Sequence, residues 1–207
     1  MTQMYKVFVN QKEVILTTDP PKKAKVLPLK DTSFSKITRI LRETKTKQLY
    51  LLHHNPDKLL SLFKKKLPVT IAAGGVVFNE ENKLLFICRK KKWDLPKGRV
   101  EPKESLEKGG KREVKEETGV KKLKVGELAG ITYHIFKRNN RYQLKETHWF
   151  YMTTNYQGDL MPEAKEDITK AVWKGRRKAE KALKKTYPNI ARLFEKTSLL
   201  KSISEEE

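Results

Sequence analysis

The segment from residue 98 to residue 120 constrains this chain more than any other part of the sequence. It reads GRVEPKESLEKGGKREVKEETGV, in which Ser105 can cap a helix. A helix turns by about 100° per residue, so Glu113, Glu116 and Glu117 would share one helical face within an arc of about 100°. Carboxylates so close repel one another unless a cation lies among them. The segment therefore predicts three converging carboxylates, and oxygen ligands without His or Cys favour Mg²⁺ or Mn²⁺.

Two features of the same segment concern the helix itself. Gly119 follows the last turn and predicts a left-handed helix end, which glycine adopts at little cost. Gly109 and Gly110 lie one turn before the carboxylates and weaken the helix by about 2 kcal/mol relative to alanines. Their missing side chains predict close packing of the helix on a sheet, or else room for substrate.

The spacing of the charged residues and glycines resembles the pattern that defines the Nudix hydrolase family. The matching positions are Gly98, Glu104, Arg112-Glu113, Val114, Glu116-Glu117, Gly119 and Val120. Chance agreement at all of them is rarer than about one in a million at average residue usage. The resemblance implies an α/β (α+β) Nudix fold, in which helices sandwich a mixed β-sheet.

The resemblance also implies an activity. Nudix enzymes hydrolyse a phosphoanhydride bond in a nucleoside diphosphate linked to a further group, and they use Mg²⁺ or Mn²⁺. It implies that Glu113, Glu116 and Glu117 bind the metal together with the backbone carbonyl of Gly98. Arg112 would orient the glutamates through charge-assisted hydrogen bonds.

The remaining roles are also carried over from the family. Glu104 and Gly119 are expected to be orienting or structural. A further carboxylate often comes from a loop near the end of the domain, and Glu166 is the position of choice here, with Glu163 second. Either Glu113 or Glu166 would accept the proton of the attacking water.

The lead-in Trp93-Asp94-Leu95-Pro96-Lys97-Gly98 narrows the substrate class. It resembles the lead-in of Nudix enzymes that act on dinucleoside polyphosphates, diphosphoinositol phosphates and triphosphorylated nucleotides. Dinucleoside polyphosphates or nucleoside triphosphates are therefore the favoured substrates. Lys97 and Arg89 are candidates for binding phosphate, although simple exposure is an equally good interpretation of Lys97. ADP-ribose is disfavoured, because a proline expected beyond the motif is absent from residues 130–140.

The net charge of +21 indicates a surface that attracts polyanions such as nucleotides, RNA or polyphosphate. The same charge could simply keep the protein soluble. The positive charge is also compatible with a second activity, the removal of pyrophosphate from RNA 5′ ends, because RNA is a polyanion. A third interpretation is a non-catalytic Nudix-fold regulatory module, but such modules commonly lose one or more of the carboxylates that are present here.

The order of predicted elements suggests two domains. Residues 1–66 predict a small ββαβα domain of unknown role, and residues 69–200 the Nudix hydrolase domain. In the first, strands are expected at 5–9, 13–16 and 48–53, one helix is capped by Asp31 or Ser33, and another begins at Asn55-Pro56. In the second, strands are expected at 70–78, 83–89, 124–129, 131–137 and 145–153, with a helical tail over 172–194.

Cysteine content and hydrophobicity indicate the compartment. Cys88 is the single cysteine, so no intramolecular disulfide can form, which fits a reducing environment. No apolar run approaches the roughly 20 residues that a membrane span needs. A cytoplasmic protein without a membrane partner is expected, and the resemblance leaves a homodimer open.

Overall fold

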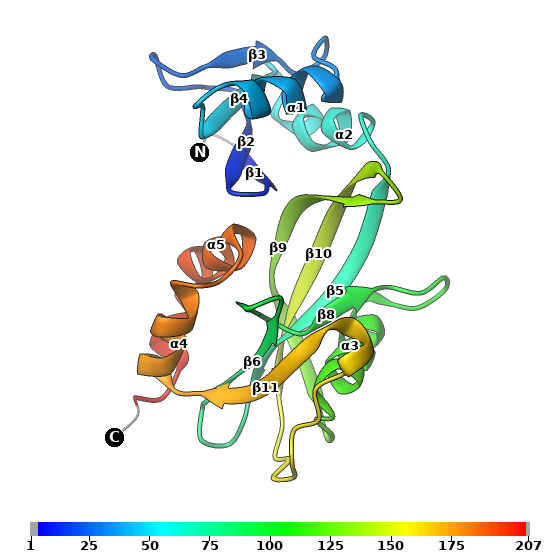
Figure 1. Ribbon diagram of the computed structural model, residues 1–207, viewed down its shortest axis with the longest axis vertical. Coiled ribbons are helices and arrows are strands. Elements are labelled where there is room, and N and C mark those ends of the chain that lie inside the picture. The colour runs from blue at the N-terminus through cyan, green and yellow to red at the C-terminus, as the bar shows by residue number, and fades with distance from the viewer. Residues whose placement is uncertain (1–3, 206–207) are drawn as a thin grey trace. The chain divides into compact units, whose positions relative to one another are not determined.

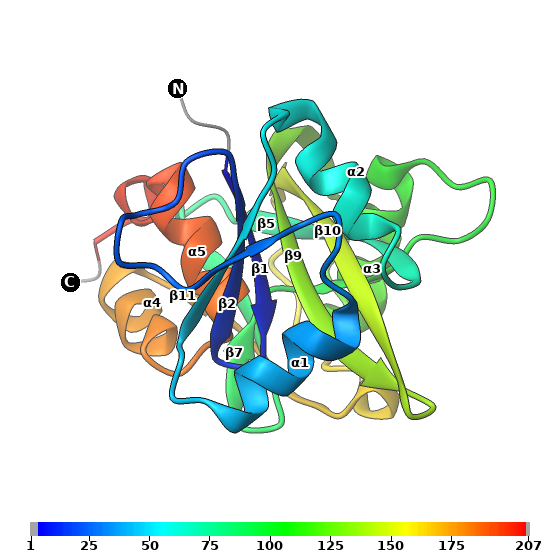
Figure 2. The ribbon, with the colours of Figure 1, turned by 90° about the horizontal axis from the view of Figure 1, so that it is seen from above.

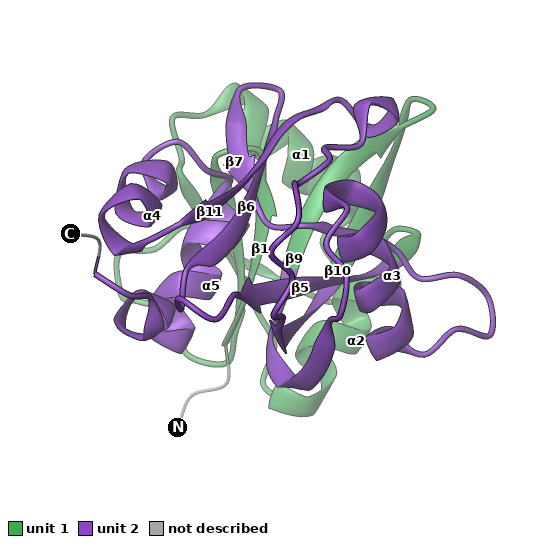
Figure 3. Cartoon of the chain, turned by 90° about the horizontal axis from the view of Figure 1, so that it is seen from below, with its two compact units in different colours: residues 1–70, 133–146 green, residues 71–132, 147–207 purple. Residues whose placement is uncertain are grey.

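The computed structural model describes residues 4–205 and divides into two compact units (Figure 3). The first unit comprises residues 1–70 and 133–146, and the second comprises residues 71–132 and 147–207. Residues 1–3 and 206–207 lie outside the described part of the chain. The two long strands β9 and β10 contribute residues to both units, so the first unit holds the end of this hairpin besides the N-terminal segment.

The first unit is a small sheet with the strand order β9-β1-β2-β4-β3. Strands β1 and β2 form an antiparallel hairpin, whereas β2 and β4 are parallel and are joined by a crossover through α1. The elements are β1 (Met4–Val9), β2 (Lys12–Thr17), β3 (Val26–Pro28), α1 (Phe34–Glu43), β4 (Gln48–Leu52), the 3₁₀ turn η1 (Pro56–Lys58) and α2 (Leu59–Lys64).

The expected helix starts in this unit are confirmed. Ser33 caps α1 by accepting the Lys36 amide, and Asn55 caps η1 by accepting the Asp57 amide. The proline-containing stretch before α1 includes the short strand β3, which the sequence analysis did not predict and which pairs with β4 in parallel. Proline can close such a strand because its missing N–H is not needed at the strand end.

The second unit is built on strands in the order β11-β6-β5-β10, with β8 paired to β5 and β7 paired to β6. The elements are β5 (Val69–Phe78), β6 (Leu84–Arg89), β7 (Lys92–Asp94), β8 (Lys97–Arg99), α3 (Leu106–Thr118), β9 (Lys124–Arg138), β10 (Arg141–Thr153), η2 (Ala164–Glu166), β11 (Ile168–Lys174), α4 (Arg176–Leu183), α5 (Pro188–Thr197) and η3 (Leu199–Ser202).

Two cores lie on opposite faces of this sheet. Val76 and Leu84 belong to one core, while their chain neighbours Val77 and Leu85 belong to the other, as alternation along a strand requires. The first core includes buried residues of α4 and α5, and the second includes Val114 of α3. Figures 1 and 2 show α3 on one side of β5 and β6, and α4 and α5 on the other. The expected mixed sheet between helices is confirmed.

Two expectations for the second unit were wrong. Residues 124–138 form one long strand instead of two, because Gly130 lies within the strand and faces Leu193 rather than ending it. The tail is a strand up to Lys174, since β11 pairs with β6, and only then becomes helical. Pro188 opens the second of its two helices, α5.

Glycines bring the carboxylate helix close to the sheet. A Cβ on Gly110 would lie 3.4 Å from the Cβ of Ala73 and 3.3 Å from the amide of Gly74. The packing interpretation of the paired glycines therefore fits the structure. None of the helices in the described part of the chain has the length and hydrophobicity needed to span a bilayer.

Gly74→Ala is expected to destabilise the protein strongly. The added Cβ would collide with the backbone carbonyl of Pro96 and the Cβ of Lys97, neither of which can turn away. Overpacking of this kind costs about 1–3 kcal/mol or more, measured as the free energy of unfolding in urea. Gly126→Ala is the matched control, because its Cβ would meet only ordinary contacts of 3.4 Å and beyond. Equal stability of the two variants would contradict this packing.

Candidate active site

Local capping fixes both ends of α3. Ser105 accepts the backbone N–H of Lys108 at 3.3 Å, and Gly119 ends the helix with a φ of +73° while donating to the Lys115 carbonyl. These are the start and the left-handed end that the sequence predicts. The segment before η2 is bonded to the end of α3, because the Met161 amide donates to the Thr118 carbonyl at 2.8 Å. Both ends of the helix are therefore defined by local hydrogen bonds, and its C-terminal end is also bonded to the segment before η2.

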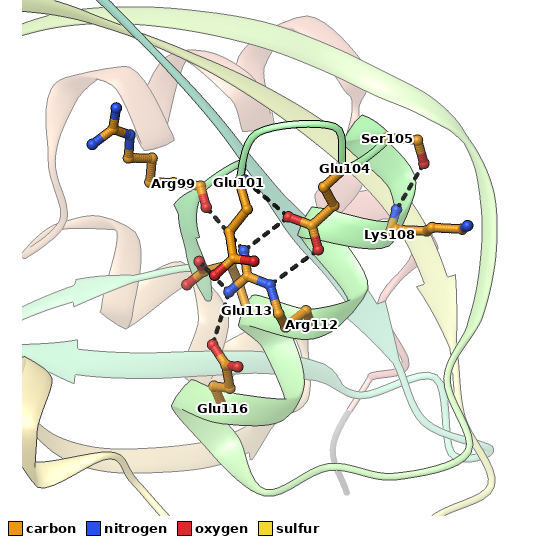
Figure 4. Close-up of polar contacts among 8 residues, drawn as sticks. All are labelled: Arg99, Glu101, Glu104, Ser105, Lys108, Arg112, Glu113 and Glu116. Atoms are coloured by element: carbon orange, nitrogen blue, oxygen red, sulfur yellow. Dashed lines mark hydrogen bonds and ion pairs between the residues drawn. The ribbon is translucent and has the colours of Figure 1, made fainter.

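Arg112 is the centre of the polar network on α3 (Figure 4). Its Nε and Nη2 atoms donate to the two carboxylate oxygens of Glu104, each at 3.0 Å, in a bidentate pair. Its Nη1 donates to Glu113 at 2.8 Å and to Glu116 at 2.9 Å, and Nη2 also reaches the Arg99 carbonyl at 2.9 Å. The hydrogen bonds that Arg112 donates to Glu104, and after it to Glu113 and Glu116, raise the pKa of Arg112. All five donors of the guanidinium are used, so it stays charged and fixed.

Glu117 is almost completely buried and points toward β8. Its Oε2 accepts the backbone N–H of Lys97 at 2.8 Å. Burial raises the pKa of Glu117 from 4.5 to about 7; Lys97 opposes this shift, and the negative charges of Asp94 and Glu113 add to it. A carboxyl group in this setting holds a proton near neutral pH unless another cation replaces it.

Glu113 lies directly against the backbone of Gly98. A Cβ at Gly98 would overlap the Glu113 carboxylate, so only glycine leaves room for this side chain. Burial raises the pKa of Glu113, and the charges of Glu116 and Glu166 act in the same direction, although Arg112 opposes them. Glu166 is therefore close enough to Glu113 for their charges to interact.

The expected convergence of the three carboxylates is not found in this arrangement. Within residues 4–205, no group of three His, Cys, Asp or Glu side chains is placed to hold a metal ion. The reason is that other donors hold the oxygens: Arg112 binds Glu113 and Glu116, and the Lys97 amide binds Glu117. The backbone places the glutamates on one region of α3, but hydrogen bonds to these donors determine the directions of their side chains.

The two expected phosphate ligands lie in different surroundings. Lys97 is buried, and its ammonium donates to Asp94 at 2.6 Å and to the Leu95 carbonyl at 3.4 Å. Burial alone would lower the pKa of Lys97, but Asp94 and Glu117 raise it overall. Arg89 is partly exposed and pairs with Glu166 at 3.2 Å, so two residues that are far apart in the sequence meet here. Their roles toward phosphate stay predictions.

Asp94 is the residue that sequence reasoning missed. It is buried, accepts the Leu95 amide at 2.8 Å and pairs with Lys97, which in turn donates its amide to Glu117. This chain of contacts couples the lead-in to the carboxylate helix. The spacing of Asp94 and Lys97 was the available signal, but an acid and a base three residues apart are common on exposed surfaces.

A comparison with known families now identifies the chain. The family described as the NUDIX domain matches residues 68–196, which is more than half of the sequence. The chain belongs to the Nudix hydrolase family, as the resemblance of the motif implied.

Individual relatives are similar over shorter stretches. A Bacillus subtilis (strain 168) protein named as a candidate 8-oxo-dGTP diphosphatase is 50% identical over 52 residues, which are 24% of this chain and 35% of that protein. A MutT-like protein from Streptomyces ambofaciens is 42% identical over 64 residues, 30% of this chain and 41% of that protein. The chain thus spans about two fifths or less of these curated relatives.

Among solved structures, a MutT protein from Methanosarcina mazei Go1 is similar, with a TM-score of 0.51 and 25% identity. The match covers 64% of this chain and 95% of that one.

Proposed function

We propose that this protein is a metal-dependent pyrophosphohydrolase that cleaves a phosphoanhydride bond in a nucleoside triphosphate or a dinucleoside polyphosphate. The observation that carries the proposal is the set of glutamates on α3, of which Glu117 is buried and bonded to β8 while Arg112 binds Glu113 and Glu116. A helix that only displayed a solvated acidic face would not bury Glu117 almost completely or give it a pKa of about 7.

The oxygen donors on α3 and β8 are of the kind that a hard divalent cation, Mg²⁺ or Mn²⁺, prefers, although their side chains would have to turn toward the ion. Glu113, Glu116 and Glu117 would hold it with the Gly98 carbonyl, because carboxylate and carbonyl oxygens are the ligands that such ions prefer. The raised pKa values of Glu113 and Glu117 mark unfavourable negative charge that a cation would relieve. Glu116 is half exposed and held only by Arg112, so it can turn toward an ion at small cost.

The residues would divide the chemistry among them. A bound cation supplies neutralisation of the phosphate oxygens and a lower pKa for a water molecule. Arg112 and Glu104 hold the carboxylates in position, since the bidentate pair leaves the guanidinium no freedom to rotate. Glu113 or Glu166 would accept the proton of the attacking water as the bond from phosphorus to the leaving phosphate oxygen breaks. Arg89, which pairs with Glu166, would bind a phosphate of the substrate.

Two observations support triphosphates as substrates. The lead-in from Trp93 to Gly98 resembles that of enzymes for triphosphorylated nucleotides and dinucleoside polyphosphates. The name of the Bacillus subtilis relative also refers to a nucleoside triphosphate, 8-oxo-dGTP. RNA with a 5′ triphosphate is the second candidate, because the charge of +21 favours a polyanionic substrate.

A panel of substrates tests the proposal. The purified protein is incubated with nucleoside triphosphates including 8-oxo-dGTP, diadenosine tetraphosphate, ADP-ribose and 5′-triphosphorylated RNA, and the products are resolved. Cleavage of the triphosphates or the dinucleotide with weak salt dependence is expected. Preference for RNA, with kcat/KM falling steeply as salt rises, would select the second candidate instead. No cleavage of any member would favour a regulatory module.

Metal binding is expected to change the pH dependence of stability. Without metal, the folded protein keeps a proton on Glu117 up to about pH 7, while the unfolded chain releases it near pH 4.5. The folded state thus binds more protons in this window, and the free energy of unfolding falls as pH rises through it. Mg²⁺ takes the place of the proton, so it should raise Tm more at pH 8 than at pH 5.

Differential scanning calorimetry with and without millimolar Mg²⁺ measures this effect. Glu117→Gln is the control, because an uncharged amide should flatten the pH dependence of the metal-free protein. A Tm that does not respond to Mg²⁺ at pH 8 would contradict metal binding by the free enzyme.

A further inference from the structure

A cleft lined by lysines lies in the second unit, away from the carboxylates of α3. Its volume is about 440 Å³, and Trp93 forms part of its wall. Five lysines line the rest together with Ala182: Lys174, Lys178, Lys181, Lys184 and Lys185. No acidic residue occurs in the described lining. We refer to this set as the lysine cleft.

The lysine cleft is formed by α4 and the residues directly after it, together with Trp93 of β7 and Lys174 at the end of β11. Along α4, residues three apart lie on one face, so Lys178 and Lys181 are exposed together while Ala179 and Ala182 are buried. Two more lysines follow directly after the helix end. The polypeptide beyond α4 is fixed to Trp93, whose amide donates to the Lys185 carbonyl at 3.0 Å. The backbone that carries Lys184 and Lys185 is therefore fixed to β7 by this hydrogen bond.

The lysine cleft is separate from the proposed catalytic face. Trp93 packs against the core that contains Phe86 and Ala182, whereas Val114 of α3 belongs to the core on the other face of the sheet. The indole stacks edge-on against Phe86, with ring centroids 6.5 Å apart. No lysine of this cleft takes part in the proposed hydrolysis, so the positive charge of the cleft needs another explanation.

Electrostatics favour a ligand with several phosphates. Exposed lysines this close repel one another, and an anion that contacts several of them removes that repulsion. From Lys178 to Lys184 the chain rises by about 9 Å along the helix, a length over which a nucleic-acid strand presents more than one phosphate. A single phosphate could contact fewer of these lysines than a strand with several phosphates could.

We propose that the lysine cleft binds the phosphate backbone of single-stranded nucleic acid. Lysines act as point charges without the planar fork of arginine, so they contact phosphates without reading bases. Lys174 lies over the Trp93 ring, 3.8 Å from its centroid, so the ring face is already covered by a cation instead of being open to a base. The binding is therefore independent of sequence.

Fluorescence anisotropy with a labelled uridine oligonucleotide tests this site. The oligonucleotide carries a 5′ hydroxyl and the buffer contains a chelator, so no phosphoanhydride can be hydrolysed and the outcome does not depend on the proposed activity. The variant Lys181→Gln/Lys184→Gln/Lys185→Gln removes three exposed charges of the cleft. The control Lys121→Gln/Lys122→Gln/Lys124→Gln removes three exposed charges after α3.

The salt dependence gives the quantitative result. Each phosphate contact on a single strand contributes about 0.7 to the slope of log K against log salt concentration, so the cleft variant should lose about 2 from this slope. The control should lose less than about 0.7. Equal losses in the two variants, or an unchanged slope in the cleft variant with its melting temperature preserved, would overturn the proposal.

Discussion

Glu116→Gln is expected to lower kcat at least about a hundredfold while leaving the melting temperature nearly unchanged. Such a loss corresponds to about 2.7 kcal/mol of transition-state stabilisation, which is a modest value for a lost metal ligand. The fold should persist because the Glu116 side chain is 50% exposed and makes only the contact with Arg112 on the surface of α3. Steady-state kinetics at saturating substrate and Mg²⁺ measure the change.

Glu107→Gln is the matched control on the same helix. Nine positions separate the two glutamates, so at about 100° per residue Glu107 points to the opposite side of α3. It is exposed and should tolerate the change with activity retained. If Glu116→Gln and Glu107→Gln were equally active, Glu116 would have no part in catalysis, and the assignment of the carboxylate face would fail.

Arg112→Lys is expected to reduce both stability and activity. Lysine keeps the positive charge but cannot form the bidentate pair with Glu104 while also reaching Glu113 and Glu116. Charge-assisted hydrogen bonds contribute about 1.5–3 kcal/mol each when buried, and partial exposure here reduces the net loss to about 2 kcal/mol. For a chain of this size Tm should fall by about 4–8 °C. kcat should fall as well, because the glutamates lose their orientation.

Arg99→Lys is the control, because it shows how much stability is lost when an arginine outside this network is replaced by lysine. Arg99 contributes its backbone carbonyl to Arg112, while its own side chain is exposed and directed away from the carboxylates (Figure 4). Calorimetry should therefore show little change for Arg99→Lys. An Arg112→Lys protein as stable as the parent would mean that the five hydrogen bonds of Arg112 contribute nothing net to folding.

Local signals allowed the motif helix to be predicted from sequence. Ser105 and Gly119 specify its start and its left-handed end through contacts within a few residues, and the spacing of the glutamates fixes their place on the helix. The directions of the carboxylates were not predictable in the same way. They depend on Arg112 and on the Lys97 amide of β8, a strand that only tertiary pairing with β5 brings to the helix.

The two wrong predictions have the same explanation: local sequence patterns suggested one structure, and tertiary pairing determines another. Gly130 looked like a break between two strands, but pairing and packing carry β9 through it, and its missing side chain faces Leu193. Val172 and Trp173 fitted a helical pattern, yet pairing with β6 places them in β11. The buried pair of Asp94 and Lys97 likewise follows from burial, which sequence spacing does not determine.

Hydrolysis of a nucleoside triphosphate by chelator-treated protein tests the central claim most directly. Product is measured before Mg²⁺ is added, after Mg²⁺ is added, and in the Glu116→Gln variant under both conditions. The account predicts no product without metal, rapid cleavage of the phosphoanhydride after Mg²⁺ is restored, and almost none in the variant. Cleavage that proceeds equally fast in the presence of chelator, or equally fast in Glu116→Gln, would contradict the assignment of the α3 carboxylates as the metal-dependent catalytic site.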